Sequence, residues 1–556
     1  MKKRKLLVVL GVGLLSISSC TQPSVEPEPE EERIPEDTTS LNVIEDNYRN
    51  YYQILVGTFA DGDGSSDKMG DLKGVKAKLD YIKDTGFNGL WMLPVFTSPS
   101  YHKYDATNYY EIDPKYGTMQ DLQDLLTTAH TKNIKVILDL VLNHCATDNP
   151  LYTNWLTQVQ RKARGETLSE EEDKIAESFS YETYTGSESV RNGFHQVAET
   201  GGKRIAVECR FTSSMPEFNF DSEYVRQYFK DVIKYYVDMG VDGFRCDAVR
   251  YLYYGNPQKN YEALSYFASY AKSLKADTYF VGENWEANAS TKGYYRNTTF
   301  DSYFNFDACG PNSGSICSTL GTTAGFPDLF LDLAENNIDL ACGHIPAPFL
   351  DNHDMNRVAL SSKDAFKINK ARMGLLQILN GSTFTYYGDE LGMTNNTTYG
   401  DPGRRVHFPW SKTEKTYNCK DPENASSKGC YPAGYLDEQM ADENSIYNYT
   451  KKALLLRNQN PEIARGEILD SSDAITIYDE NDEEVLQNYL LMDKSYNNST
   501  IRIVYNFSDK YDLEYTYKDT SYTSVVGQLC ATDDTYITRI DESTIRIPPL
   551  GMAILK

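Results

Sequence analysis

The feature that most constrains the fold is a repeated alternation of short apolar segments and amphipathic segments over residues 51–390. Several of the apolar segments are nearly continuous, which is typical of parallel strands covered on both faces. The apolar segments are residues 51–59, 89–96, 135–143, 241–249, 278–284, 302–308, 347–354 and 383–390. Eight such strands separated by helices predict an α/β protein built on a (β/α)8 TIM barrel.

The segments between these strands repeat apolar residues every three or four positions, as a helix with one buried face requires. One such run has Leu72, Val75, Leu79 and Ile82 and ends at Gly86; a second has Val225, Phe229, Val232 and Tyr236 and ends at Gly240. A glycine is a common stop signal for a helix. Further helices are expected near residues 119–132, 258–275, 363–379 and 443–458.

Two parts of the chain do not fit the barrel repeat. About a hundred residues separate the third and fourth strands, too many for one helix and two loops, so we expect an inserted domain over 145–216 with a charged surface helix at 160–176. The short alternating stretches of 467–556 predict a separate C-terminal all-β sandwich domain. The catalytic barrel is therefore expected in two parts, 46–144 and 217–466.

The N-terminus has the pattern of an export signal. Basic residues 2–5 precede an apolar run at 6–15, and small residues lead to Cys20. The sequence Ile17-Ser18-Ser19-Cys20 resembles a bacterial lipobox, which predicts a signal peptide over 1–19 and a lipid on Cys20; the alternative is an ordinary cleaved signal with a chance cysteine. Residues 20–45 are acidic and proline-rich, so we expect a tether and an extracellular lipoprotein anchored to the bacterial membrane.

Charge and cysteine content narrow the classes of partner. A formal net charge of −25 opposes binding to a phosphate backbone, so no nucleic-acid partner is expected. An oxidising compartment permits disulfides, and spacing suggests three pairs, although sequence does not determine connectivity. The suggested pairs are Cys309 with Cys317, Cys419 with Cys430, and Cys145 with Cys209, whereas Cys246 lies in an apolar strand and is expected to be a buried thiol.

Polar residues gather at the carboxyl ends of the predicted strands, where a barrel of this type places its catalytic groups. These residues are Asp139, Asn143 and His144; Arg245, Asp247, Arg250 and Tyr251; Glu283 and Trp285; and Asn352, His353 and Asp354. Each group alone has a structural interpretation: Arg-x-Asp can be an ion pair, Asn-His can cap a turn, and a glutamate beside a tryptophan can be a packed acid. Together they predict three carboxylates on one rim.

Four motifs in order, DLVLNH, GFRCDAVRY, GENW and FLDNHD, fall on strands three, four, five and seven. In this order and at barrel spacing the chain resembles the α-amylase family, glycoside hydrolase family 13. The resemblance implies retaining catalysis, with Asp247 as the nucleophile, Glu283 as the acid and base, and Asp354 as the residue that holds sugar hydroxyls. A retaining pair needs its carboxyl groups about 5–5.5 Å apart, and crowding raises the pKa of one of them.

The resemblance also implies the residues that surround the substrate. Arg245 points to the same face of its strand as Asp247 and should keep that carboxylate ionised. His144 and His353 are expected to donate hydrogen bonds to the sugar, with Tyr104 stacking on it and Asp105 supporting the same subsite. Arg250 and Tyr251 are expected on the leaving-group side, and Arg357, one helical turn past His353, in the same network.

The loop after the first strand is rich in oxygen ligands suited to a structural Ca²⁺ ion. The candidate ligands are Asp61, Asp63, Ser65, Asp67 and Asp71. The family often has a calcium loop here, but this loop is two residues longer, and the alternative is a solvated turn. A second family site would use Asn143, although Glu217 stands where some relatives have a ligand aspartate.

Ala248 follows the expected nucleophile, where relatives specific for α-1,6 bonds tend to have valine, so α-1,4 bonds are favoured. With an export signal, this predicts a monomeric, endo-acting α-amylase whose partner is an α-glucan polysaccharide or oligosaccharide. The alternatives are a 4-α-glucanotransferase, a neopullulanase-like or maltogenic enzyme, and a non-catalytic cell-surface glucan binder.

Overall fold

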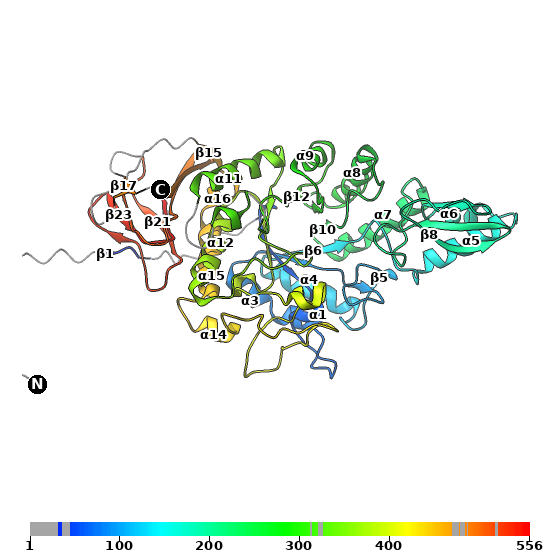
Figure 1. Ribbon diagram of the computed structural model, residues 1–556, viewed down its shortest axis with the longest axis horizontal. Helices are drawn as coiled ribbons and strands as arrows, with labels where there is room; N and C mark the ends of the chain where they lie inside the picture. The colour runs from blue at the N-terminus through cyan, green and yellow to red at the C-terminus, as the bar shows by residue number, and fades with distance from the viewer. Residues whose placement is uncertain are drawn as a thin grey trace, which may run out of the picture.

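The computed structural model describes residues 32–35, 45–311, 314–320, 326–469, 488–517 and 521–556, and the backbone of 477–478 and 484–485 (Figure 1). The expected signal peptide, Cys20 and most of the expected tether lie outside these residues. Among the described helices, each is too short or too polar to span a bilayer.

A barrel of eight parallel strands forms the centre of the molecule, as predicted. Its strand order is β13-β12-β11-β10-β6-β3-β2-β14, and a parallel bridge between Phe349 and Phe384 connects the two ends. The strands are β2 (Asn50–Ile54), β3 (Gly89–Met92), β6 (Lys135–Leu140), β10 (Gly243–Cys246), β11 (Tyr279–Gly282), β12 (Ser302–Asn305), β13 (Ala347–Pro348) and β14 (Thr383–Tyr386).

Helices cover the outside of the barrel. They include α2 (Leu72–Ala77), α3 (Leu79–Thr85), α4 (Met119–Thr131), α7 (Glu223–Met239), α8 (Pro257–Leu274), α9 (Asn288–Asn297), α11 (Pro327–Ala341), α12 (Phe366–Ile378) and α15 (Ile446–Gln459). In α7 the periodic residues Val225, Phe229 and Val232 are buried, and the helix ends at Gly240 with φ of +108°, which glycine adopts at no steric cost. Helices α9 and α11 were not predicted from the sequence.

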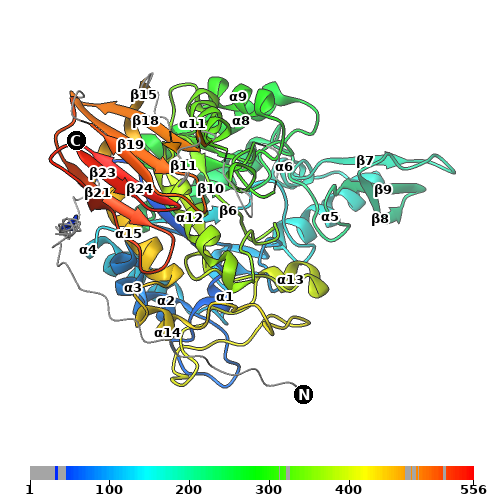
Figure 2. The same cartoon turned by 60° about the vertical axis from the view of Figure 1, so that its left-hand side comes forward.

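The inserted domain lies between β6 and α7 and projects from one side of the barrel (Figures 1 and 2). It contains α5 (Pro150–Ala163), α6 (Glu170–Ala176) and an antiparallel sheet in the order β7-β9-β8, with β7 (Tyr181–Tyr184), β8 (Phe194–Thr200) and β9 (Lys203–Glu208). The single surface helix expected at 160–176 is wrong. Gly165 has φ of +82°, and Ser169 caps a new helix, so 160–176 holds the end of α5 and all of α6.

The C-terminal domain is the predicted all-β sandwich, on the side of the barrel away from the inserted domain (Figures 1 and 2). One sheet has the order β15-β18-β19-β24-β21 and the other β1-β22-β23-β20. The strands are β15 (Glu467–Leu469), β18 (Tyr489–Tyr496), β19 (Ser499–Asn506), β20 (Leu513–Thr516), β21 (Val525–Cys530), β22 (Thr538–Arg539), β23 (Thr544–Ile547) and β24 (Gly551–Leu555). Strand β1 (Glu32–Arg33) comes from the segment expected to be a tether, so that expectation does not hold for these residues.

The six cysteines of the three suggested pairs are free thiols, so none of these disulfides is formed. The Sγ atom of Cys309 faces the carbonyl oxygen of Phe306 at 3.1 Å, and that of Cys209 faces the carbonyl of Ser213 at 3.8 Å. Sequence spacing failed here because a disulfide depends on the directions of both side chains. Cys246 is a buried thiol in β10, as predicted, and burial raises its pKa.

Candidate active site

A single buried arginine organises the floor of the candidate site. Strands β6 and β10 pair in parallel with Asp139 opposite Arg245. Nη1 of Arg245 lies 2.9 Å from Oδ1 of Asp139 and 2.7 Å from Oδ1 of Asp247, while Nη2 lies 3.1 Å from Oε1 of Glu283. Asp247 and Glu283 directly follow their strands, so the barrel itself brings both carboxylates to one guanidinium.

The third carboxylate, Asp354, is held by two other groups, His353 and Arg405. Its Oδ2 lies 3.0 Å from Nε2 of His353, and its Oδ1 accepts a hydrogen bond of 2.7 Å from Nη2 of Arg405. Arg405 also donates to the carbonyl of His353 at 3.0 Å and to the hydroxyl of Tyr101 at 3.1 Å. Two cationic or polar partners therefore fix the orientation of Asp354.

Burial and neighbouring charges give the three carboxyl groups different pKa values. Burial raises the pKa of Asp247 to about 6 and that of Glu283 to about 7, although Arg245 opposes both shifts. Burial also acts on Asp354, but His353 and Arg405 outweigh it and hold the pKa of Asp354 below its usual value. Near neutral pH the site thus combines ionised carboxylates with one acid able to carry a proton.

The three carboxylates line a pocket of about 520 Å³. His144 also lines it, and the buried Nε2 of this histidine has no hydrogen-bond partner among the described residues, so it is free to meet a ligand. On the rim, Phe211 and Trp285 are 47% and 49% exposed, which leaves apolar surface for a sugar ring. The pocket thus combines a carboxyl group able to carry a proton, ionised carboxylates and apolar walls.

The family model described as "Alpha amylase, catalytic domain" matches residues 53–466, which include the whole pocket floor. The chain belongs to the α-amylase family. It is 34% identical over 433 residues to "Alpha-amylase 3" of Dictyoglomus thermophilum, covering 76% of this chain and 79% of that one. A 4-alpha-glucanotransferase of Thermotoga maritima is 27% identical over 443 residues, covering 77% and 91%. Among solved structures, Eubacterium rectale Amy13B aligns with a TM-score of 0.79 at 31% identity, covering 93% and 97%.

Within this α-amylase family site, several predicted substrate residues lie at the pocket. Tyr104, Arg250 and Tyr251 line it. The Tyr104 ring stacks on His353 at 5.5 Å between centroids, and its hydroxyl donates to Asp139 at 3.0 Å. Arg250 pairs with Glu286 at 2.8 Å, so the guanidinium is held at the rim.

Two other predicted substrate residues, His353 and Asp105, are not among the residues that line the pocket. His353 is fully buried, and its Nε2 contacts the Tyr104 hydroxyl at 2.6 Å as well as Asp354. Asp105 is 8% exposed and accepts hydrogen bonds from Ser98 and Ser100, so it braces the loop that carries Tyr104.

The prediction that Arg357 belongs to the substrate network is wrong, because its guanidinium does not reach the substrate pocket. The side chain is fully buried, and Nη1 donates to Asp389 at 2.8 Å. The expectation assumed a helical turn after His353, but residues 351–360 form turns and loop. The i, i+4 spacing therefore does not place the two side chains on one face.

Three residues that line the pocket were not predicted from the sequence to contact substrate: Arg405, Phe211 and Trp285. Arg405 lies in the stretch DPGRRVHFPW, where two adjacent arginines after the last strand were the available signal. Trp285 was visible in GENW but was weighed only as a packing partner. Nothing in the sequence pointed to Phe211, because the pocket receives it from the inserted domain.

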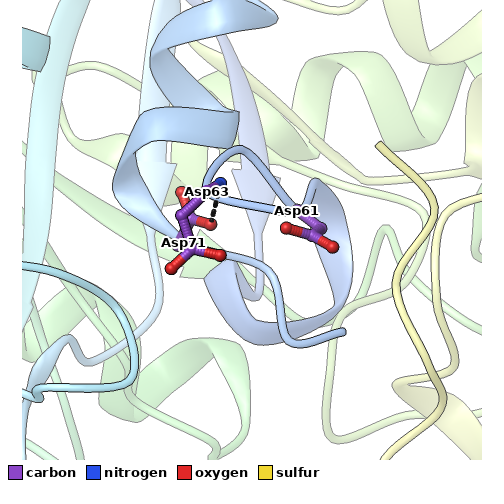
Figure 3. Close-up of side chains that lie close together, drawn as sticks. All are labelled: Asp61, Asp63 and Asp71. Carbon is purple, nitrogen blue, oxygen red and sulfur yellow. Dashed lines mark hydrogen bonds between the residues drawn. The ribbon is translucent and has the colours of Figure 1, made fainter. Parts of the chain in front are cut away.

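The predicted metal loop brings together three of its five candidates (Figure 3). Carboxylate oxygens of Asp61, Asp63 and Asp71 lie within 4.8 Å of one another. Lys68 reaches into this group, with Nζ 3.0 Å from Oδ2 of Asp61, whose side chain is fully buried. Asp67 lies outside the group and accepts a hydrogen bond of 2.5 Å from Ser65. Clustered carboxylates with one lysine counter-charge fit a divalent cation if the ammonium moves away.

The surroundings of Asn143 fit a second metal site poorly. Its neighbour Glu217 accepts a hydrogen bond of 2.9 Å from the backbone N–H of Arg210, and the Arg210 guanidinium pairs with Glu208 at 2.6 Å. Burial raises the pKa of Glu217 to about 7. Arg210 thus supplies the positive charge next to Glu208 and Glu217. The Nδ2 atom of Asn143 lies 3.4 Å from Nδ1 of His144.

Proposed function

We propose that this α-amylase family enzyme is an endo-acting α-amylase that hydrolyses α-1,4-glucosidic bonds of starch and malto-oligosaccharides with retention of configuration. The observation that carries the proposal is the sharing of Arg245 by Asp247 and Glu283, with Asp354 lining the same pocket. One cation keeps a nucleophile ionised beside an acid whose pKa is about 7, which a retaining double displacement needs.

In this mechanism Glu283 donates its proton to the glycosidic oxygen while an Asp247 oxygen attacks the anomeric carbon. The leaving chain departs with the proton, and a glycosyl ester on Asp247 forms. Glu283 is then a carboxylate and takes a proton from water, whose oxygen attacks the same carbon and releases Asp247. Asp354, ionised between His353 and Arg405, binds sugar hydroxyls and stabilises the developing positive charge.

A 4-α-glucanotransferase is the second candidate, and a specific feature favours it. The exposed rings of Phe211 and Trp285 line the pocket together with Arg250 and Tyr251, the two residues expected on the leaving-group side. The Trp285 ring is backed by Phe306, 4.8 Å away and nearly parallel, and its other face is left for a sugar. Such surfaces retain a sugar acceptor that competes with water. A maltogenic or neopullulanase-like activity is a variant of the same chemistry.

We also propose that a structural Ca²⁺ ion binds at Asp61, Asp63 and Asp71. These carboxylates would supply its charge and oxygen ligands, and the ion would replace the ammonium of Lys68 as their counter-charge. Asp71 in addition caps α2 by accepting from Gly74 at 2.8 Å, so the ion would brace the start of the first barrel helix.

The proposed location is the cell surface. The basic and apolar residues at 2–15, followed by Cys20, support export and attachment of a lipid to that cysteine. An enzyme outside the cell meets starch as a polymer or a long oligosaccharide, which agrees with endo-acting cleavage.

The test is product analysis on soluble starch, maltoheptaose and pullulan, with Asp247→Asn in parallel. Short malto-oligosaccharides from starch with the α-anomer formed first, pullulan untouched and an inactive variant would support an α-1,4-specific retaining amylase. Chains longer than maltoheptaose would establish the transferase instead, and panose from pullulan the neopullulanase-like activity. Glucan binding without any product would overturn catalysis in favour of a surface glucan binder.

A further inference from the structure

A short segment before the barrel pairs with the far end of the chain. Strand β1 runs antiparallel to β22, with Glu32 opposite Arg539 and Arg33 opposite Thr538. The N–H of Ile34 donates to the carbonyl of Ile537 at 3.1 Å. Pro35 follows, and because proline has no N–H, it cannot donate a hydrogen bond to the neighbouring strand. Figure 1 shows β1 against the C-terminal sandwich.

Side chains reinforce this pairing. Ile34 is 5% exposed and packs in the apolar core of the sandwich with Leu513 and Ile545. Buried Gln528 bridges the two strands, because its Nε2 donates to the carbonyl of Ile34 while its Oε1 accepts from the N–H of Ile537 at 3.0 Å.

Charged residues at the edge of the sheet also favour this pairing. The guanidinium of Arg33 lies 4.8 Å from the ring centre of Tyr536. Glu32 and Arg539 are directly opposite, a favourable pair across two strands. The backbone pairing, the buried side chain of Ile34 and the bridge made by Gln528 together hold residues 32–35 on the sandwich.

We propose that residues 32–35 are a clasp that holds the N-terminal segment on the C-terminal sandwich and sets how far the enzyme stands from its membrane. The part that concerns the distance from the membrane rests on the lipid at Cys20 proposed above. Cys20 lies twelve positions before Glu32 but thirty before Asn50, where the barrel begins. At about 3.4 Å per residue, the clasp limits the reach of the lipid to about 40 Å, against about 100 Å without it.

The clasp also determines which face turns to the membrane. The sandwich lies on the opposite side of the barrel from the inserted domain (Figures 1 and 2). Phe211, from the chain that leads out of the inserted domain, lines the pocket. The clasped enzyme therefore has its sandwich next to the bilayer and its inserted domain farthest from it.

The docking half is tested on the chain from Thr21 to Lys556 by limited trypsin digestion. Arg33 is the first lysine or arginine in that chain, so release of the peptide 21–33 reports cleavage at Arg33 alone. Gln528→Ala removes the bridge and should release the peptide at least about tenfold faster, while Gln196→Ala, an exposed glutamine in β8, should not change the rate. Equal rates in the native chain and in Gln528→Ala would overturn the clasp.

Hydrogen exchange of the native chain gives a second readout that needs no variant to fold. The amides of Ile34 and Ile537 should exchange at least about tenfold more slowly than Ile34 in a synthetic peptide of residues 21–40. Exchange of Ile34 at the peptide rate would also overturn the clasp.

The standoff half is tested on the full chain in membranes. An alkyne fatty acid should label the chain but not Cys20→Ala, and energy transfer from labelled lipids to a fluorophore joined at Lys556 should fall in Gln528→Ala. Unchanged energy transfer in Gln528→Ala would overturn the proposal that the clasp sets the distance from the membrane. Absence of fatty-acid labelling would overturn only the lipid anchor, because protection of Arg33 is measured independently of it.

Discussion

The backbone N–H of Ala248 donates to Oε2 of Glu283 at 3.0 Å, from a residue whose φ of +48° lies in the left-handed region. Arg245 lies against the other oxygen, Oε1, at 3.1 Å. Both oxygens of the proposed acid are therefore located by groups next to the proposed nucleophile. The strained residue is the one that turns its N–H toward Glu283.

This geometry predicts opposite results for two substitutions of Ala248. Ala248→Gly relieves the strain and should keep kcat on maltoheptaose within about threefold. Ala248→Val places a β-branched residue at positive φ, which is more strained there than alanine, and should lower kcat about tenfold or more by moving the N–H. Since that N–H favours the carboxylate, its loss should also move the alkaline limb of the pH profile upward. Equal kcat and equal limbs in the two variants would contradict the positioning role.

The acidities of the pair predict a narrow bell-shaped profile of kcat/KM. Asp247 must be ionised, so activity should fall as pH drops through about 6, and Glu283 must be protonated, so activity should fall as pH rises through about 7. The charge of Asp139 raises the pKa of Asp247, so Asp139→Asn should move the acid limb to lower pH. Initial rates on maltoheptaose between pH 4 and 9 measure both limbs. An acid limb that stays in place in the variant would refute this assignment.

Arg405 should contribute through Asp354, which it orients together with His353. Arg405→Gln removes the cation and should lower kcat/KM by about 100-fold, with a smaller loss in Arg405→Lys, which keeps the charge but not the fork of contacts. The exposed Arg164 in the inserted domain offers a matched Arg164→Gln control. If Arg405→Gln and Arg164→Gln had similar kcat/KM, Arg405 would have no part in holding Asp354.

Calcium should stabilise the loop that carries Asp61, Asp63 and Asp71. At a hundredfold excess over Kd, binding contributes about 2.7 kcal/mol, which for a domain of this size should raise Tm by about 3 °C. In Lys68→Gln the buried Asp61 loses its ion-pair partner, so the metal-free protein should be less stable and the calcium-induced rise in Tm larger. Differential scanning calorimetry with EDTA and then with excess CaCl₂ measures both. A Tm that does not respond to calcium in either protein would eliminate the site.

Lys494 joins the sandwich to the barrel. Its buried Nζ donates to the carbonyls of Ile378 at 2.7 Å and Ile463 at 2.9 Å and to Oδ1 of Asn380 at 2.7 Å. Lys494→Met leaves three buried acceptors without a donor and should destabilise the protein by about 2–4 kcal/mol, with kcat at 25 °C unchanged. The exposed Lys428→Met is the control in urea unfolding monitored by tryptophan fluorescence. No difference between these two variants would show that the acceptors find other partners.

The barrel was predictable because its signals are local. Each strand is a short apolar run with a turn signal beside it, and burial on both faces of a parallel sheet requires that pattern. The grouping of Asp247, Glu283 and Asp354 follows from the same rule, since residues just after parallel strands share one rim. Their catalytic roles stay predictions that the pH profile and Asp247→Asn will test.

The failures share a cause, which is dependence on distant parts of the chain. Arg357 was misplaced because its direction depends on the turns after Asp354, and the suggested disulfides failed because spacing does not give side-chain directions. Phe211 reaches the pocket from the inserted domain, and Arg405 contacts Asp354 from 51 positions further along the chain.

The sequence by itself thus determined the barrel, the order of its domains and the strand ends on which the three carboxylates lie, because hydrophobic periodicity and strand-end position are read over a few residues. Only the tertiary structure decided that Arg245 is shared by Asp247 and Glu283, that Ala248 adopts positive φ, and that residues 32–35 cross to the C-terminal sandwich. Those outcomes depend on contacts between segments far apart in the chain, whose relative positions are set by packing of the whole fold.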